Sequence, residues 1–414
     1  MSVQQEQVLT QSLGSGSFGF LASFVGRLLR RVLGRLECGE LIVETPGGDR
    51  LVFGGCRPGP QGRLVIHSWR FLGRLVSGWD IGFAEGYMAG EWSSPNLAAL
   101  LTLACRNNSM VEPLKALRLP RFGLRLRHAL NRNTRRGSRR NIAAHYDLGN
   151  EFYKRWLDAG LTYSAAKFSS ASQTLEEAQE AKIDRVLTLL EPGIGDKVLE
   201  IGCGWGGLAE RMLQKHDCTV TGVTLSAEQL AYAKRRLQAH ISVARCDLLL
   251  QDYRDVRGTF DRIVSIEMLE AVGEAYWATY FEKLRDRLRP GGIAVLQVIT
   301  IDENRFENYR RRPEFIQRYI FPGGMLPTTQ IIEQKSGEAG LQLVSKECFG
   351  EGYARTLEQW RVRFQDAWPD IKAVLGFDEC FKRMWDYYLA YCQVGFDTSA
   401  LDVGLYKLVK ATNS

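Results

Sequence analysis

The stretch "KVLEIGCGWGGLAERM" constrains the fold of this chain more than any other. A short apolar run ends at Glu200, and Gly202, Gly204, Gly206 and Gly207 follow before a helix-like pattern begins. A strand, a glycine-rich turn and a helix in this order are typical of doubly wound α/β sheets, which bind ligands at the carboxyl ends of their strands. We therefore expect a ligand site at this turn.

From about residue 141, segments with strand and helix patterns alternate along the chain. Strands are expected at 196–202, 218–226, 241–248, 260–269 and 292–301, and helices at 205–216, 227–240 and 275–292. Two later strands, 341–349 and 401–410, flank helical residues 354–395. The alternation predicts the α/β class, with a doubly wound, Rossmann-like sheet that carries a helical insertion.

The residues before this pattern predict a smaller α+β domain. Segment 40–55 has the alternation and the turn residues of a hairpin, and segment 93–104 has the pattern of a helix that opens with Ser-Ser-Pro. Ten Lys or Arg residues and no acidic residue lie between Lys115 and Arg140. The chain therefore divides into an N-terminal domain, a basic linker and an α/β domain, at 1–114, 115–140 and 141–414.

Charge and cysteine content bear on the surroundings of the chain. The basic run suggests a polyanionic partner or an anionic membrane surface, although a solvated helix and linker would also explain it. Residues 18–36 carry four arginines, which excludes a transmembrane helix and leaves a basic amphipathic helix on a surface or a helix packed on its own domain. Nine cysteines without a CxxC pair fit a reducing cytoplasm, and five histidines without zinc spacing predict no metal site.

The glycine turn matches the dinucleotide pattern G-x-G-x-x-G at Gly202, Gly204 and Gly207. The carboxylate before it argues against a phosphate ligand, because Glu200 would repel a pyrophosphate. The chain also lacks, after the second strand, the acidic residue that binds the ribose in dinucleotide enzymes. S-adenosylmethionine (SAM) fits better, since it has a sulfonium and an ammonium group and no phosphate.

The ends of the second and third strands supply polar side chains for such a ligand. Thr224, Ser226 and Gln229 follow the second strand and can bind a ribose or a carboxylate. Gln251 and Asp252 follow the third strand and can bind an adenine amine. Thr224 and Ser226 have a second interpretation, because hydroxyl side chains also cap the helix that follows.

Eight segments taken together resemble one family of enzymes. They are "YDLGNEFYKRWLD" (146–158), "TYSAAKF" (162–168), "LEIGCGWGG" (199–207), "GVTLSAEQ" (222–229), "QDYRD" (251–255), "DRIVSIEMLEAVG" (261–273), "YIFPGGMLP" (319–327) and "GYARTLEQW" (352–360). Their order and sequence resemble the cyclopropane-fatty-acid synthase family, whose mycolic-acid members share the catalytic half. The stretch "GFAEGYMAGEW" is similar, less sharply, to the lipid-binding domain of the members that act on phospholipids.

The resemblance implies a reaction and a cofactor. Members of the family transfer the SAM methyl group to a cis double bond inside a phospholipid acyl chain. The transfer leaves a carbocation on the acyl chain. Loss of a proton from the added methyl group then closes a cyclopropane ring. By position, the SAM-binding residues are expected to be Tyr163, Ser164, Glu200, Gly202, Gly204, Gly206, Gly207, Thr224, Leu225, Ser226, Gln229, Gln251 and Asp252.

The family holds a bicarbonate ion as the proton acceptor, and this chain retains part of that site. The expected catalytic positions are Glu270, Tyr353 and the backbone of Ile299, with Ala165 and Gln297 where the family has cysteine and histidine. Bicarbonate held by these residues would give a cyclopropane fatty acid, which is our first expectation. A weakened or displaced base would instead give a methyl or methylene branch. Methylation of an already conjugated acyl chain is a third outcome.

The resemblance and the charge pattern together imply a protein of the cytoplasm, bound peripherally to the inner face of the membrane. The expected partners are unsaturated phospholipid acyl chains and an anionic membrane surface, and the family suggests a homodimer. A non-catalytic lipid carrier that kept the fold is a second hypothesis, which the intact glycine turn and Glu270 disfavour. No nucleic-acid partner is expected, because Phe122 is the only Phe, Tyr or Trp in the basic run.

Overall fold

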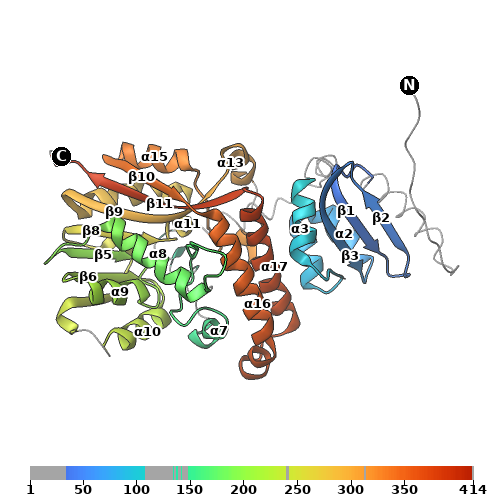
Figure 1. The fold of residues 1–414 in the computed structure, drawn as a ribbon, viewed down its shortest axis with the longest axis horizontal. Helices are drawn as coiled ribbons and strands as arrows, with labels where there is room; N and C mark the ends of the chain where they lie inside the picture. Colours follow the sequence, from blue (N-terminus) through green and yellow to red (C-terminus); the bar gives the residue numbers. More distant parts are fainter. Residues whose placement is uncertain are drawn as a thin grey trace. The chain divides into compact units, whose positions relative to one another are not determined.

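The computed structural model describes residues 34–107, 134, 137–138, 141, 148–238, 242–311 and 314–412 (Figure 1). Most of the helix expected at 18–36 and of the basic run at 115–140 lies outside these residues. The chain forms two compact units. One comprises Met1–Arg121 with Phe377–Thr398, and the other comprises Phe122–Gly376 with Ser399–Ser414.

The first unit contains a four-stranded sheet with the strand order β2-β1-β3-β4. The strands are β1 (Cys38–Glu44), β2 (Arg50–Gly54), β3 (Arg57–Ile66) and β4 (Trp92–Ser93). The expected hairpin is confirmed, because β1 and β2 pair antiparallel with Glu44 opposite Arg50.

Two helices follow these strands, α2 (Arg70–Met88) and α3 (Leu97–Arg106). The helix expected at 93–104 begins later, at Leu97. Asn96, rather than one of the serines before it, caps the helix by accepting a 3.0 Å hydrogen bond from the Ala99 backbone N–H.

A helix from far along the chain completes this unit. α17 (Glu379–Asp397) packs against α2 and α3, and its buried Asp386 accepts a 2.6 Å hydrogen bond from the Tyr87 hydroxyl. The division made from the sequence had placed this helix in the domain at 141–414. The difference arises because this contact joins residues 299 positions apart, for which the local pattern holds no signal.

The second unit is built on a seven-stranded sheet with the order β10-β11-β9-β8-β5-β6-β7 (Figure 1). The strands are β5 (Lys197–Ile201), β6 (Thr219–Thr224), β7 (Cys246–Leu250), β8 (Phe260–Ile266), β9 (Leu288–Ile301), β10 (Leu341–Cys348) and β11 (Leu401–Lys410). The five strands from β5 to β9 are parallel, whereas β10 and β11 pair antiparallel. This is the doubly wound, Rossmann-like sheet that the sequence predicts.

Helices cover both faces of this sheet because alternate strand residues point to opposite sides. Leu199 of β5 belongs to an apolar cluster with residues of α12 (Trp277–Arg287). Its neighbour Val198 belongs to a second cluster with residues of α8 (Leu175–Leu190) and α9 (Gly207–Lys215). Strands buried on both faces are typical of parallel sheets.

The remaining helices of this unit have the following bounds: α7 (Asn150–Lys154), α10 (Ala227–Gln238), α11 (Leu269–Val272), α13 (Glu303–Arg310), α14 (Phe315–Tyr319), α15 (Thr329–Glu338) and α16 (Gly350–Leu375). The third strand was expected at 241–248 but begins at Cys246, because Val243–Arg245 form a short 3-10 turn. The helix expected at 275–292 ends at Arg287, where β9 takes over.

Candidate active site

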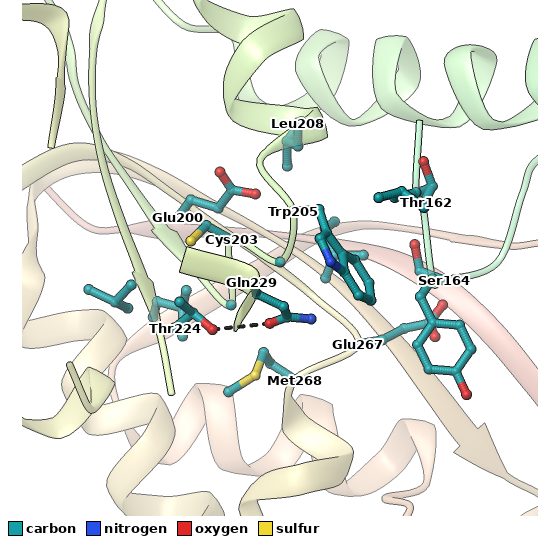
Figure 2. Close-up of a pocket in the computed structure, with 18 of the residues that line it drawn as sticks. Thr162, Ser164, Glu200, Cys203, Trp205, Leu208, Thr224, Gln229, Glu267 and Met268 are labelled. Atoms are coloured by element: carbon teal, nitrogen blue, oxygen red, sulfur yellow. Dashed lines mark hydrogen bonds between the residues drawn. The ribbon is translucent and has the colours of Figure 1, made fainter. Parts of the chain in front are cut away.

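A pocket lies at the carboxyl ends of β5, β6, β7 and β8 (Figure 2). The expected SAM-binding residues that line it are Tyr163, Ser164, Glu200, Gly202, Gly204, Gly207, Thr224, Leu225, Gln229 and Gln251. Gly206, Ser226 and Asp252 are not among its lining residues. The sheet therefore brings together most of this set from separate strand ends, as the rule for parallel sheets requires.

The glycine turn after β5 is tight and is tied to β6. The backbone N–H groups of Gly202 and Cys203 both donate to the carbonyl of Val223, at 2.9 and 3.1 Å. Gly202 has a φ of +85°, and a Cβ there would lie 2.5 Å from Met268 Cγ. Gly206 has a φ of +84°, and a Cβ there would lie 3.1 Å from the Ala233 Cβ. Gly206 therefore lies where α9 packs on α10, and its part in SAM binding stays a prediction.

Glu200, at the end of β5, presents a buried carboxylate to this pocket. Its side chain is 3% exposed, and its Oε2 has no hydrogen-bond partner among the described residues. Burial raises the pKa of this carboxyl to about 8, although the charge of Lys182 opposes the shift. A buried acceptor without a partner fits a ligand that brings a donor or a positive charge, and it disfavours a phosphate.

Lys182, on α8, is a pocket residue that the sequence reading missed. Its side chain is 2% exposed, and its ammonium group donates a 2.7 Å hydrogen bond to Ser164 Oγ. Burial lowers the pKa of Lys182 to about 8. The helical period carried a signal, because Lys182 follows Ala178 and Gln179 at the spacing of the buried face of α8.

Polar side chains at the end of β6 form a connected set. The Thr224 hydroxyl donates to Gln229 Oε1 at 3.1 Å, which fixes the amide of Gln229 at the pocket wall (Figure 2). The hydroxyl of Ser226 accepts from the Gln229 backbone N–H at 3.2 Å. Ser226 therefore caps α10, as the second interpretation of this residue anticipated, while Thr224 and Gln229 face the pocket.

The two residues after β7 differ in position. Gln251 lines the pocket, and its backbone N–H donates to the carbonyl of Thr224 at 3.0 Å. The carboxylate of Asp252 instead accepts two hydrogen bonds from Arg254, from Nε at 2.8 Å and from Nη2 at 2.6 Å. The binding of an adenine amine by Asp252 stays a prediction.

Glu267, directly after β8, is the second pocket residue that the sequence reading missed. Its Oε1 accepts hydrogen bonds from the Ala165 backbone N–H at 2.7 Å and from Gln297 Nε2 at 2.8 Å. Its Oε2 accepts from the Tyr353 hydroxyl at 2.8 Å. Removal from water raises the pKa of Glu267, while these three hydrogen bonds oppose the shift. Its place at the end of a parallel strand, like that of Glu200, was the signal that could have found it.

The backbone of Glu267 is strained. Its φ is 49°, in the left-handed region, which costs a residue with a Cβ roughly 1–2 kcal/mol. Such strain persists where the surroundings impose it, and it concentrates at functional sites. At Glu267 the strained backbone and the three hydrogen bonds described above occur together.

All five expected catalytic positions lie around this carboxylate or next to it. Ala165, Gln297 and Tyr353 hold Glu267, and the backbone N–H of Ile299 donates to Glu270 Oε1. Burial, together with the charge of Glu267, raises the pKa of Glu270 to about 8. None of these five residues lines the pocket. Glu267, which accepts hydrogen bonds from three of them, does line it.

The same contacts test the fit of a bicarbonate ion. The resemblance assigned the ion to the groups at positions 165, 270, 297, 299 and 353. Three of these groups already donate to Glu267, and the Ile299 N–H donates to Glu270. The donors that an anion needs are thus occupied by two carboxylates of the chain. The residues present do not fit bicarbonate in this arrangement.

Aromatic rings connect the two halves of the site. Tyr163, which lines the pocket, lies 5.2 Å from Trp360 between ring centroids, and Trp360 lies 6.1 Å from Tyr353. A row of aromatic rings therefore runs from the pocket to the Tyr353–Glu267 hydrogen bond. The face of an aromatic ring attracts a positive charge within about 6 Å.

Two further properties of the described residues bear on the site. Within the described part of the chain, no three His, Cys, Asp or Glu residues are grouped so that they could hold a metal ion. In the same part, no helix combines the length and the apolar character that crossing a membrane requires.

A family model described as mycolic acid cyclopropane synthetase matches residues 133–405. The chain belongs to this family. The tuberculostearic acid methyltransferase of Mycobacterium tuberculosis is 39% identical over 398 residues, which cover 94% of this chain and 91% of that protein. The cyclopropane-fatty-acyl-phospholipid synthase of Escherichia coli K12 is 37% identical over 344 residues, which cover 82% of this chain and 85% of that protein.

Solved structures of mycolic acid cyclopropane synthases share the fold. The cyclopropane synthase MmaA2 from Mycobacterium tuberculosis has a TM-score of 0.62 and 32% identity, covering 66% of this chain and 98% of that one. The synthase CmaA1 complexed with SAH and CTAB also has a TM-score of 0.62, with 30% identity and the same coverage. The chain is therefore a SAM-dependent methyltransferase that modifies lipids, and the family and enzyme class expected from the sequence are confirmed.

Proposed function

We propose that this methyltransferase transfers a methyl group from SAM to a double bond in an unsaturated acyl chain of a membrane phospholipid, and that Glu267 accepts the proton released. The observation that carries the proposal is the Glu267 carboxylate, which lines the SAM pocket and is held by Ala165, Gln297 and Tyr353.

The pocket supplies what SAM requires. When bound, SAM contributes an electrophilic methyl carbon on a sulfonium. The turn at Gly202 and Gly204 would lie against the cofactor, Thr224 and Gln229 would bind the ribose, and Glu200 would meet the positively charged end. The unpartnered Oε2 of Glu200 supports this assignment.

The reaction needs no activated nucleophile, because the π electrons of the alkene form the new carbon–carbon bond. The neighbouring alkene carbon becomes a carbocation, and the added methyl group must lose one proton to restore neutrality. A carboxylate is a suitable acceptor, since it gains a proton as the hydrocarbon loses its charge. The ring of Tyr163, which lines the pocket, can stabilise that charge.

The hydrogen bonds of Glu267 favour a methylene branch over a ring. A 1,2-hydride shift converts the first, secondary cation into a tertiary one on the carbon that carries the methyl group, and loss of a methyl proton then gives an exocyclic C=CH2. Three of the roughly four lone-pair sites of Glu267 are occupied, so proton removal is slowed and the shift can come first. The relative that matches over 94% of this chain is named a methyltransferase and not a cyclopropane synthase.

A cyclopropane fatty acid is the second candidate product. Direct loss of the methyl proton, before any hydride shift, closes the ring and uses the same acceptor. The 37% identity to the Escherichia coli cyclopropane-fatty-acyl-phospholipid synthase supports this candidate.

The substrate implies work at a membrane surface from the cytoplasmic side. The ten basic residues between Lys115 and Arg140 all lie outside the described residues, and they support docking on anionic lipid by their charge alone. Purified protein should co-sediment with anionic vesicles and detach at high salt, and equal binding to neutral vesicles would remove this argument. Association of two copies remains a prediction of the family resemblance.

The experiment that tests the function is lipid analysis of a host that expresses the protein. Monounsaturated chains should gain the mass of one CH2 group, which both candidate products share. Proton NMR of the extracted fatty acids then separates them, because exocyclic methylene protons resonate in the olefinic region and ring methylene protons lie far upfield. Unchanged lipids in cells that contain folded protein and SAM would contradict the proposal.

A further inference from the structure

The pocket has two sides that the sheet order distinguishes. β6 and β7 lie on one side of β5, and β8 lies on the other. Thr224 and Gln251, the side chains suited to a ribose and an adenine, follow β6 and β7. The amino-acid end of SAM should therefore lie on the side of β5 and β8, where Lys182 and Glu200 line the wall.

Lys182 is a buried cation without a paired anion. Ser164 Oγ is its one hydrogen-bond or ion-pair partner among the described residues, and an ammonium group has three protons to donate. The charges of Glu267, Asp158 and Glu200 act on Lys182 from beyond ion-pair distance. A buried charge that lacks a direct partner is costly, so the pocket is suited to a ligand that brings an anion.

Glu200, near the end of β5, is the group of opposite type in the same wall. Its buried Oε2 has no partner among the described residues, so the same wall holds an acceptor that lacks a donor. Figure 2 shows Glu200 at the glycine-turn end of the pocket and Ser164, the partner of Lys182, nearer to Glu267. The wall thus offers a cation and a buried acceptor to a ligand that carries both charges.

We propose that Lys182 binds the carboxylate of the SAM amino-acid moiety while Glu200 accepts its ammonium group, so that the pair selects a zwitterionic ligand. This inference rests on the assignment of the pocket to SAM. Among the described lining residues, Lys182 is the one Lys or Arg side chain, so the carboxylate has no other full positive charge to meet.

The test compares two ligands that differ by one group. S-adenosylhomocysteine (SAH) has the carboxylate, and its decarboxylated analogue, S-adenosyl-3-thiopropylamine, keeps the ammonium alone. Calorimetry on the full chain should show that Lys182→Met weakens SAH binding at least about ten-fold, as expected for a lost charge-assisted hydrogen bond. Affinity for the analogue should change less than about two-fold.

Two further variants sharpen the result. Lys182→Arg keeps the charge and should retain the preference for SAH over the analogue. Lys215→Met removes a lysine on α9 that pairs with Asp184 outside the pocket, and it should leave both affinities unchanged. Equal weakening of both ligands by Lys182→Met would overturn the inference, because a merely structural role affects them alike.

The wild-type protein provides a measurement that does not depend on the folding of a variant. It should bind SAH at least about ten-fold more tightly than the analogue, and equal affinities would overturn the role of Lys182. If neither ligand binds, the assignment of the pocket to SAM fails instead. Failure of acyl-chain methylation with this preference intact would count against the proposed substrate alone.

Discussion

The Tyr353 hydroxyl donates a 2.8 Å hydrogen bond to Glu267 Oε2, which joins α16 to the carboxyl end of β8. The two residues lie 86 positions apart in the chain. This bond stabilises the ionised form of Glu267 and occupies one lone-pair site of its carboxylate. Tyr353 is therefore a positioning residue for the proposed proton acceptor, and its removal has consequences that can be measured.

Tyr353→Phe should shift the acid limb of the pH–rate profile to higher pH by about one unit. Glu267 must be ionised to accept a proton, so turnover falls as the pH drops through its pKa. That pKa is already raised by removal from water, and the Tyr353 hydrogen bond lowers it, so the variant raises it further.

The same variant should increase the share of ring product, since it frees one lone-pair site and speeds proton removal relative to the hydride shift. Tyr87→Phe is the matched control, because Tyr87 also donates to a carboxylate, Asp386, but in the other unit. An unchanged acid limb in Tyr353→Phe would show that Glu267 does not control the rate.

Glu267→Gln should reduce turnover by about 10²–10⁴-fold, the usual contribution of a proton acceptor, while SAH affinity stays within about two-fold. Turnover is measured as SAH release with unsaturated phospholipid, and affinity is measured by calorimetry. Glu270→Gln is the comparison variant, because the family resemblance placed Glu270, and not Glu267, at the proton-acceptor site. Glu270 does not line the pocket, so its variant should lose less than about ten-fold. A larger loss from Glu270→Gln than from Glu267→Gln would assign the role to Glu270.

Binding of SAH should exchange protons in a way that depends on pH. Burial raises the pKa of Glu200 to about 8, so much of this carboxyl is protonated at pH 7, and a ligand ammonium that lowers this pKa releases the proton. Burial lowers the pKa of Lys182 to about 8, and a ligand carboxylate raises it. Proton release from Glu200 should therefore dominate below about pH 8, and proton uptake by Lys182 should dominate above it.

Calorimetry in buffers of different ionisation enthalpy measures this exchange. Glu267 and Asp158 also face Lys182, and Lys182 faces Glu200, so the measurement is repeated in Lys182→Met, which should show release without uptake. Methylthioadenosine, which lacks both charged groups, should exchange far fewer protons than SAH. Equal exchange for the two ligands would exclude these groups as the source.

Local patterns predicted the sheet because each of its strands has its own apolar run and its own turn. The glycines at 202 and 206 illustrate this, since one is required by the turn and the other by helix packing. Thr224, Gln229 and Gln251 could be placed at the pocket for the same reason, because strand ends of a parallel sheet meet at one edge.

Other features depend on contacts that a local pattern does not contain. The membership of α17 in the first unit depends on Asp386 and Tyr87, which are far apart in the chain. Glu267 and Glu270 lie three positions apart on one short segment, and alignment with the family pointed to the second. Only the three donors around Glu267, from three separate parts of the chain, identify it as the group at the centre of the site.

The proton acceptor that we propose is a carboxylate of the chain rather than a bicarbonate ion. Glu267→Gly removes this carboxylate without backbone strain, because a φ of 49° suits glycine. The variant also opens the donors of Ala165, Gln297 and Tyr353 to an external anion. Glu191→Gly is the matched control, since Glu191 has a φ of 52° at the C-terminus of α8 and lies on the surface.

The most direct measurement is turnover of the purified protein on unsaturated phospholipid in buffer freed of carbon dioxide, with and without added bicarbonate. We expect the wild-type protein and Glu191→Gly to be active and indifferent to bicarbonate. Glu267→Gly should be inactive until bicarbonate is added. A wild-type protein that is inactive without bicarbonate and is restored by it would show that bicarbonate, and not Glu267, accepts the proton.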